Sequence, residues 1–222
     1  MVTAAGAVAP HCTAVPPPPA ATPPSSPAIS AAAPPTPAAA TVRPVTAAEL
    51  GASWQPDCPV KPGQLRRVKV NHVGMDEQTH SGELIVNEKL VAEVIAVFEQ
   101  LYQLRFPIEK VRTVEHYPAA ADELSMEDNN TSAFNCRRIP GSDAWSLHAY
   151  GRAIDVNPLL NPSVDASGVY VPKNAAAYLD RSRTDPGVLH DRDPATHVFT
   201  DRGWRWGGYW KSPIDYQHFE RP

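Results

Sequence analysis

The spacing of hydrophobic and polar residues changes along this chain, and the changes predict both strands and helices. Apolar residues alternate with polar ones over residues 65–73, and a second short strand is indicated at residues 83–86, after Gly82. Between residues 87 and 102 the apolar side chains recur every three or four positions, which predicts an amphipathic helix with Asn87 as its N-cap. Pro107 closes this segment.

Further short strands are indicated at residues 111–117 and 133–139, with a polar loop between them. In the second of these strands, alternation places Asn135 and Arg137 on one face. Residues 161–197 form a long, proline-bearing and mostly polar stretch with one helical candidate at residues 173–183. A stretch of this length predicts a functional lid loop.

The first part of the chain differs in composition from the rest. It is dominated by proline and alanine, and within the first 50 residues only Arg43 and Glu49 carry charge. Such a segment has little apolar pattern to bury. We therefore expect residues 1–53 to be a disordered Pro/Ala-rich tether and residues 54–222 to be one folded domain with its own core.

Charge and motifs exclude several function classes. The net charge is -4 and no stripe of Lys and Arg is present, which argues against nucleic acid as a partner. No run of 18 apolar residues predicts a transmembrane segment. The commonest nucleotide-binding loops and the H-E-x-x-H zinc motif are absent.

The expected location is extracytoplasmic or secreted, in association with the cell wall. A Pro/Ala-rich tether before a compact domain is a common design in exported proteins. The N-terminus shows no basic segment followed by an apolar run, so no standard secretory signal is evident in the sequence as given. An upstream start and a removed signal are both open alternatives.

Three cysteines are present, and Cys12 lies in the predicted tether. In an oxidising compartment Cys58 and Cys136 could close a long loop as a disulfide. Two buried free thiols are the alternative.

Two blocks of the sequence carry candidate metal chemistry. In the first block His148 precedes Asp155 by seven positions, and Gly151 between them allows the chain to turn back so that both side chains reach one point. The second block contains Asp215 and His218. His148, Asp155 and His218 would supply the three ligands of a catalytic zinc, with Asp215 as the base beside it.

Amide hydrolysis also needs positive charge opposite the metal, because its transition state is anionic. Arg137 is the first candidate, although Arg138 could face the zinc instead. We expect Ser146, Asn135 and Tyr150 to contact the substrate, being the polar residues nearest to the site in sequence. The aromatic block at residues 204–210 fits either a core wall or a pocket wall, and Trp206 is its candidate for substrate binding.

These blocks resemble the zinc D-alanyl-D-alanine carboxypeptidase family, the VanY-like peptidases that include phage endolysin peptidases. The resemblance is carried by Ser-Leu-His-Ala-Tyr-Gly-Arg-Ala-Ile-Asp at residues 146–155, Trp-Gly-Gly-Tyr-Trp at residues 206–210 and Asp-Tyr-Gln-His-Phe at residues 215–219. It implies one Zn²⁺ ion held by His148, Asp155 and His218, Asp215 as general base, and an upstream arginine that stabilises the oxyanion. The implied fold is α+β, a small antiparallel sheet with helices packed on one side and the zinc site at the sheet edge, as in the superfamily shared with the Hedgehog signalling domain.

The leading hypothesis is a monomeric zinc peptidase that hydrolyses amide bonds in the stem peptides of bacterial peptidoglycan, with D-Ala-D-Ala carboxypeptidase activity. An endopeptidase acting on the L-Ala-D-Glu bond is the alternative within the same chemistry. A non-catalytic wall-binding domain with a structural zinc is the alternative of another class. A cysteine hydrolase that pairs Cys136 with His148 would need a free thiol.

Overall fold

The computed structural model describes residues 1–3, 6 and 39–222. Residues 4–5 and 7–38, which hold most of the predicted tether and Cys12, lie outside the described residues. No helix among the described residues is both long and apolar enough to cross a membrane.

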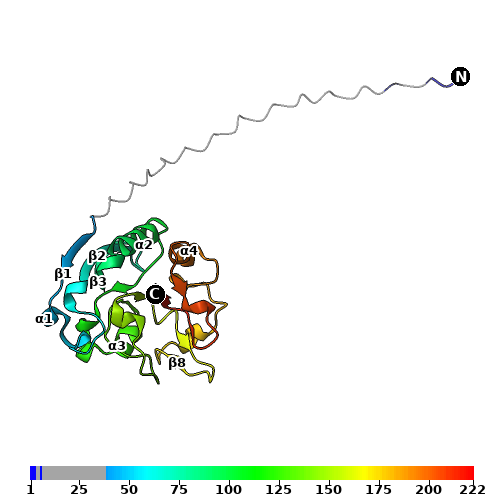
Figure 1. The fold of residues 1–222 in the computed structure, drawn as a ribbon. Coiled ribbons are helices and arrows are strands. Elements are labelled where there is room, and N and C mark those ends of the chain that lie inside the picture. The colour runs from blue at the N-terminus through cyan, green and yellow to red at the C-terminus, as the bar shows by residue number, and fades with distance from the viewer. Residues whose placement is uncertain (4–5, 7–38) are drawn as a thin grey trace. The chain divides into compact units, whose positions relative to one another are not determined.

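The described part of the chain has the predicted α+β class (Figure 1). Its α-helices are α1 (Ala47–Leu50), α2 (Val91–Gln103), α3 (Asp122–Glu127) and α4 (Pro194–Thr200). Its strands are β1 (Thr41–Pro44), β2 (Leu65–Val73), β3 (Thr79–Asn87), β4 (Lys110–Val111), β5 (Asn130–Thr131), β6 (Ala153–Asp155), β7 (Ser163–Val164), β8 (Tyr170–Val171), β9 (Arg205–Trp206), β10 (Ile214–Asp215) and β11 (His218–Glu220). Short 3₁₀ helices connect them: η1 (Gly51–Ser53), η2 (Pro62–Gln64), η3 (Glu88–Leu90), η4 (Val114–His116), η5 (Pro118–Ala120), η6 (Leu147–Tyr150), η7 (Ala176–Leu179) and η8 (Gly207–Tyr209).

The strands form three small antiparallel sheets and one parallel pair. The sheets have the orders β1-β2-β3, β6-β11-β9 and β10-β7-β8, and the parallel pair joins β4 to β5. The first sheet contains the two longest strands, β2 and β3, which pair along their whole length from Leu65↔Asn87 to Val73↔Thr79. The other two sheets come from the C-terminal part of the chain and carry the candidate site.

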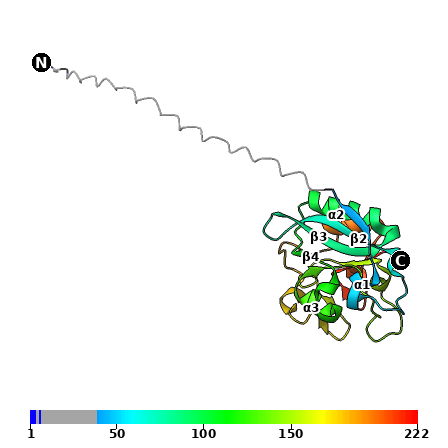
Figure 2. The same ribbon diagram turned by 90° about the vertical axis from the view of Figure 1, so that its left-hand side faces the viewer.

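Helix α2 covers one face of the first sheet (Figures 1 and 2). Val94, Phe98 and Leu101 of the apolar stripe predicted from sequence are buried in this helix, and Val97 is buried beside them. The predicted N-cap, Asn87, accepts a hydrogen bond from the Lys89 backbone, and the chain passes through the 3₁₀ turn η3 before α2 begins. The prediction of this helix is therefore confirmed, with a later start.

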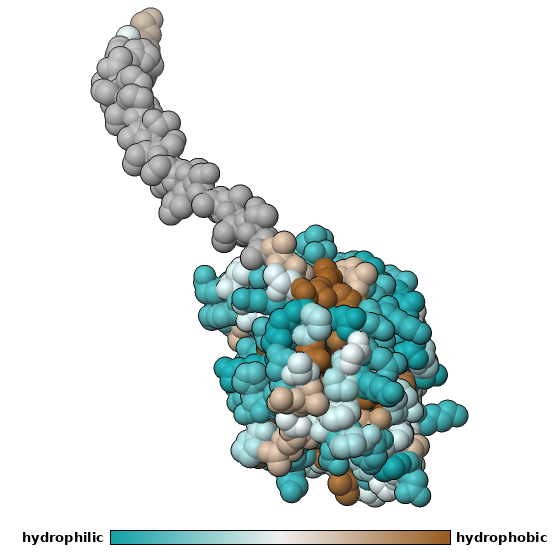
Figure 3. Space-filling view, turned by 60° about the vertical axis from the view of Figure 1, so that its left-hand side comes forward, coloured by the Kyte–Doolittle hydropathy of each residue, from teal (hydrophilic) through white to brown (hydrophobic). Residues whose placement is uncertain are grey.

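The first sheet buries apolar side chains on both faces, because successive residues of a strand point to opposite sides. Val68 and Val70 belong to the main core with α2, which also includes Ile154 and Phe219 from the second sheet. Leu65 belongs to a second cluster on the other face. On the face drawn in Figure 3, polar residues predominate at the surface and apolar residues appear in small groups between them.

The boundary of the predicted tether was wrong at its C-terminal end, because residues 41–53 are folded. Strand β1 pairs with β2, from Thr41↔Lys69 to Pro44↔Arg66. Helix α1 begins with a capping box in which Thr46 and Glu49 bond each other's backbone. The Thr-x-x-Glu pattern is a sequence signal for a helix start, and the low charge of the segment obscured it.

Gly82 does not separate two strands but lies inside β3. A Cβ atom at this position would lie 2.3 Å from the Cβ of Val111 and 2.4 Å from its carbonyl oxygen, so glycine allows β4 to approach β3. The pairing of β3 with β2, and its contact with β4, which is distant in sequence, therefore decided that Gly82 lies within a strand.

Three further local predictions were wrong. Of the strand expected at residues 111–117 only Val111 is paired, as the second residue of β4, and the chain then turns through η4. Residues 133–139 contain one isolated bridge, from Arg138 to Trp145, instead of a strand. The helix expected at residues 173–183 is limited to η7. Each of these segments bonds to distant backbone or side chains, which local propensity does not encode.

The expected lid segment, residues 161–197, is built into the domain. Strand β7 pairs with β10 and β8, and Asn161 is fully buried. The Asn161 side chain donates to the carbonyl groups of Val156, Asn157 and Gly187. The segment therefore supports the strand that carries Asp215.

Cys58 and Cys136 form a disulfide that links residues 78 positions apart, with a Cα–Cα distance of 5.9 Å. The bridge fastens the segment after η1 to the segment that leads to Arg137. Cys136 also packs against the second apolar cluster. The structure therefore does not contain the two free thiols of the alternative prediction. The disulfide also leaves Cys136 without the free thiol that a cysteine hydrolase would need as its nucleophile.

We expect the double variant Cys58→Ser/Cys136→Ser to lose about 2–4 kcal/mol of unfolding free energy, because the bridge restricts a long loop of the unfolded chain. Urea unfolding followed by circular dichroism measures this change. Reduction of the wild-type protein should lower its stability to the level of the double variant, whereas reduction of the double variant should change nothing. Equal stability of oxidised and reduced wild type would contradict the prediction.

Candidate metal centre

Three buried side chains converge in the C-terminal part of the domain. His148, Asp155 and His218 each offer one ligand atom, and these atoms all lie within 4.8 Å of one another. Nε2 of His148 is 3.1 Å from Nδ1 of His218 and 3.1 Å from Oδ2 of Asp155, and Nδ1 of His218 is 2.9 Å from Oδ1 of Asp155. The structure therefore brings together the three residues that the sequence indicated as metal ligands.

The turn at Gly151 brings His148 near Asp155, as the sequence predicted. His148 lies in η6, Gly151 ends that helix in the left-handed conformation with φ 63°, and β6 then carries Asp155 back. A Cβ atom on Gly151 would lie 2.7 Å from the backbone nitrogen of Asn87, which donates a hydrogen bond to the Gly151 carbonyl. Glycine is thus required at this position both by conformation and by space.

Antiparallel pairing places His218 beside Asp155. In the register of β11 and β6, His218 is directly opposite Asp155, and Phe219 is opposite Ile154. Side chains of directly opposed residues lie on the same face of a sheet and contact one another. Because Ile154 and Phe219 are fully buried in the main core, this register is held by apolar packing.

The second nitrogen of each imidazole has its own partner, and these partners fix the orientation of the rings. Nδ1 of His148 donates to the carbonyl of Ala133. Nε2 of His218 is 3.3 Å from Oε2 of Glu220, and Glu220 in turn forms a 2.6 Å ion pair with Arg205. Such outer partners typically fix which nitrogen binds the metal. Nε2 of His148 and Nδ1 of His218 therefore remain for a ligand.

Sequence reasoning missed Glu220 and Arg205. A signal existed, since Glu220 is two positions after His218 and both point to the same side of a strand.

The electrostatics of the cluster favour a cation. Burial alone would raise the pKa of Asp155, but the charges and hydrogen bonds of His148 and His218 outweigh it and hold the pKa below its usual range. Burial opposes protonation of His218, yet its bonds to Asp155 and Glu220 raise its pKa to about 10. The site thus stabilises positive charge strongly.

The residues present fit a zinc ion. Two imidazole nitrogens and one carboxylate oxygen form a set of three protein ligands typical of catalytic zinc, and a fourth position would stay open. The orientation of both rings by outer partners is a further requirement of such a site, and it is met.

Asp215 lies beside the cluster without belonging to it. The carboxylate oxygen Oδ1 of Asp215 is buried and has no hydrogen-bond partner. Burial raises the pKa of Asp215 to about 6, and the negative charge of Asp155 acts in the same direction, while His218, His148 and Arg137 oppose the shift. A carboxylate with a free oxygen and a raised pKa is suited to accept a proton near neutral pH.

Of the two arginines that the sequence left open, Arg137 is the one whose charge acts on Asp215. Its Nε lies 2.8 Å from Oδ2 of Asp122, an ion pair without hydrogen-bond alignment. Asn135 donates to Oδ1 of the same Asp122, so Asn135 and Arg137 do share a side as predicted. Arg138 instead covers the Trp145 ring, with its guanidinium 4.2 Å from the ring centre.

Three residues expected to bind substrate make contacts within the domain itself. Ser146 is buried and caps η6 by accepting a hydrogen bond from the His148 backbone. Tyr150 packs on the second apolar cluster. Trp206 is a core residue that donates its Nε1–H to the Tyr216 carbonyl. Trp210, a residue of the aromatic block for which the sequence indicated no role, has its ring centre 5.2 Å from that of His218.

A family model described as D-alanyl-D-alanine carboxypeptidase matches residues 140–221. This segment contains both blocks of the candidate metal centre, and the match confirms the resemblance to this peptidase family for the part of the chain that carries the site. Neither a curated protein nor a solved structure matches the chain.

We expect Glu220→Gln to lower zinc affinity about 10- to 100-fold, because an amide accepts the His218 Nε2–H less strongly than a carboxylate does. Competition with a chromogenic chelator measures the affinity. Glu88→Gln is a matched control, since Glu88 also pairs with an arginine, Arg66, but on the first sheet. Equal zinc affinity of Glu220→Gln and wild type would show that this contact does not tune the site.

Proposed function

We propose that this protein is a zinc-dependent peptidase that hydrolyses amide bonds in peptidoglycan stem peptides, acting as a D-Ala-D-Ala carboxypeptidase. The observation that carries the proposal is the juxtaposition of Asp215, with its unpaired buried oxygen, and the His148-Asp155-His218 cluster. A structural metal site has no need of a proton acceptor beside it. The family match at residues 140–221 supports the same reaction class.

In the proposed mechanism, different residues of the site bind the metal, transfer protons and stabilise the oxyanion. His148, Asp155 and His218 would hold the zinc, which when bound polarises the carbonyl group and increases the acidity of water. Asp215 accepts a proton from the attacking water and can then pass it to the leaving amine. Arg137, whose charge acts on Asp215, would supply the positive charge that stabilises the oxyanion.

The disulfide supports an extracytoplasmic location for this activity. Disulfides persist in oxidising compartments and are rare in the cytosol. The bridge between Cys58 and Cys136 lies next to Arg137 in sequence, so oxidation would also keep the arginine segment in place. Peptidoglycan is found in the same extracytoplasmic compartment.

We expect Asp215→Asn to retain zinc and to release D-alanine from a stem pentapeptide about 100-fold more slowly than the wild type, because an amide cannot accept the proton. His148→Ala should lose both zinc and activity. Zinc is measured by metal analysis after dialysis, and D-alanine by mass spectrometry with and without a chelator. Full activity of either variant would refute the mechanism.

We expect Gly207→Ala to reduce kcat by about 10-fold or more and to leave zinc affinity unchanged. A Cβ atom on Gly207 would lie 2.5 Å from the Asp215 carbonyl oxygen and 2.9 Å from its Cβ, so the base must move, and small displacements are costly in catalysis. Gly63→Ala is the control, because a Cβ atom there would meet no other atom within 4 Å and the backbone of Gly63 is unstrained. Unchanged kcat in Gly207→Ala would show that Asp215 needs no such fixed position.

A further inference from the structure

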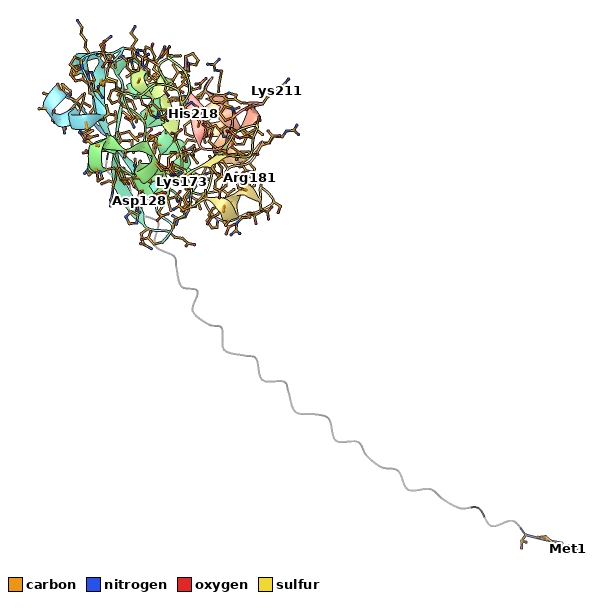
Figure 4. The ribbon with its side chains drawn as sticks, turned by 90° about the horizontal axis from the view of Figure 1, so that it is seen from below. Met1, Asp128, Lys173, Arg181, Lys211 and His218 are labelled. Carbon is orange, nitrogen blue, oxygen red and sulfur yellow. A yellow bond between two sulfur atoms is a disulfide. The ribbon has the colours of Figure 1, made fainter. Side chains whose placement is uncertain are left out.

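A second feature, outside the metal cluster, is a cavity of about 360 Å³ on the C-terminal part of the domain. A volume of this size lies in the usual range for small-ligand pockets. Its lining contains a cation, an acid, a histidine and aromatic side chains: Arg181, Asp191, His190, Trp206, Tyr209 and Tyr216. Figure 4 labels Arg181 on the C-terminal side of the domain and His218 nearer its middle.

Arg181 is half-buried and is held in place by neutral groups only. Its two terminal nitrogens donate to the carbonyls of Leu160, Tyr178 and Leu189 and to Oδ1 of Asn161. Its Nε is buried without a hydrogen-bond partner. Among the residues that the structure describes, no carboxylate lies within 4.0 Å of this guanidinium. The charge of Arg181 is therefore rigidly placed and uncompensated.

Buried and half-buried charges in proteins are generally paired, because desolvation without a counter-charge is costly. The acid at the rim of the cavity does not serve this purpose. Asp191 accepts a hydrogen bond from the Tyr209 hydroxyl at 2.7 Å and lies 3.4 Å from Nε of Arg192. The terminal N–H groups of Arg181 already donate to protein oxygens, so the cavity offers its positive charge and its aromatic walls. By charge attraction it favours a ligand that carries a carboxylate on a short organic group.

The cavity adjoins the base of the candidate metal centre. Tyr216, which lies under the Arg181 guanidinium at 4.2 Å, directly follows Asp215 in the chain. Gly207 packs on Asp215, and its neighbour Gly208 lines the cavity, so a single turn, η8, separates the two. An extended peptide of three residues spans about 10 Å, which is enough to pass over one such turn.

We propose that the Arg181 cavity binds a side carboxylate of the peptide substrate, the free α-carboxylate of the γ-linked D-glutamate residue upstream of the cleaved bond. This assignment rests on the proposed function, because it takes the substrate to be a stem peptide. The positive charge of Arg181 attracts the carboxylate, and Tyr209 and Tyr216 cover the apolar part of the residue. Peptides in which this carboxylate is amidated lose the attraction and bind more weakly.

Two pentapeptides test the proposal: L-Ala-γ-D-Glu-L-Lys-D-Ala-D-Ala and the same peptide with D-isoglutamine in place of D-glutamate. Their dissociation constants are measured by calorimetry with the zinc-loaded Asp215→Asn protein, which should not consume them, and their KM values with the wild type. We expect the free acid to bind about 10-fold more tightly than the amide. Equal affinities for the two peptides would overturn the assignment.

Two variants identify the source of the preference. Arg181→Gln should abolish it. Asp191→Asn removes a negative charge from the rim and should strengthen binding of the free acid severalfold, with little change for the amide. Because Asp191 is exposed and Arg181→Gln could affect folding, the gain in Asp191→Asn tests independently whether the carboxylate binds at this cavity. An unchanged preference in both variants would contradict the proposal.

The test separates this inference from the proposed function. D-Alanine release from both pentapeptides with equal KM would support the proposed peptidase activity and would refute the proposal that the Arg181 cavity binds the carboxylate. Tighter binding of the free-acid peptide that depends on Arg181, without release of D-alanine from either peptide, would support the carboxylate-binding cavity and would refute the proposed carboxypeptidase activity.

Discussion

The antiparallel pairing of β6 with β11 is the constraint on which the candidate centre depends. This pairing places His218 directly opposite Asp155, although 63 positions separate them in the chain. A shift of one residue would turn His218 to the other face and would also remove Phe219 from the core. The same apolar contacts that stabilise the domain therefore set the geometry of the candidate metal ligands.

Residues around this pair of strands hold the side chains of the candidate site in position. Glu220 on β11 orients His218, and the Ala133 carbonyl orients His148. Strand β10 carries Asp215 and is held by β7, which belongs to the segment that we had expected to act as a lid. A base fixed by a strand pair keeps its position during catalysis better than a base on a free loop does.

The domain combines this rigid centre with two sources of positive charge. Arg137 acts on Asp215 from the segment that the disulfide fastens, whereas Arg181 lies in the cavity on the other side of η8. Under the proposed function, a charged group of the substrate and the developing oxyanion would meet different arginines. The arrangement explains why the C-terminal segment contains so many aromatic residues: Trp206 fills the core, Trp210 lies against His218, and Tyr209 and Tyr216 form the cavity wall.

The sequence by itself determined the features that depend on local pattern: β2, the apolar stripe of α2, the turn at Gly151 and the identities of the residues that meet at the centre. Residue chemistry and short-range periodicity encode these features directly. Only the tertiary structure decided that Thr41–Pro44 joins the first sheet, that Gly82 lies within β3, that Tyr150 packs in a core cluster, that Glu220 orients His218 and that Arg181 lines a cavity. Strand partners, close backbone approach and the pairing of charges join residues distant in the chain, so no local pattern carries them.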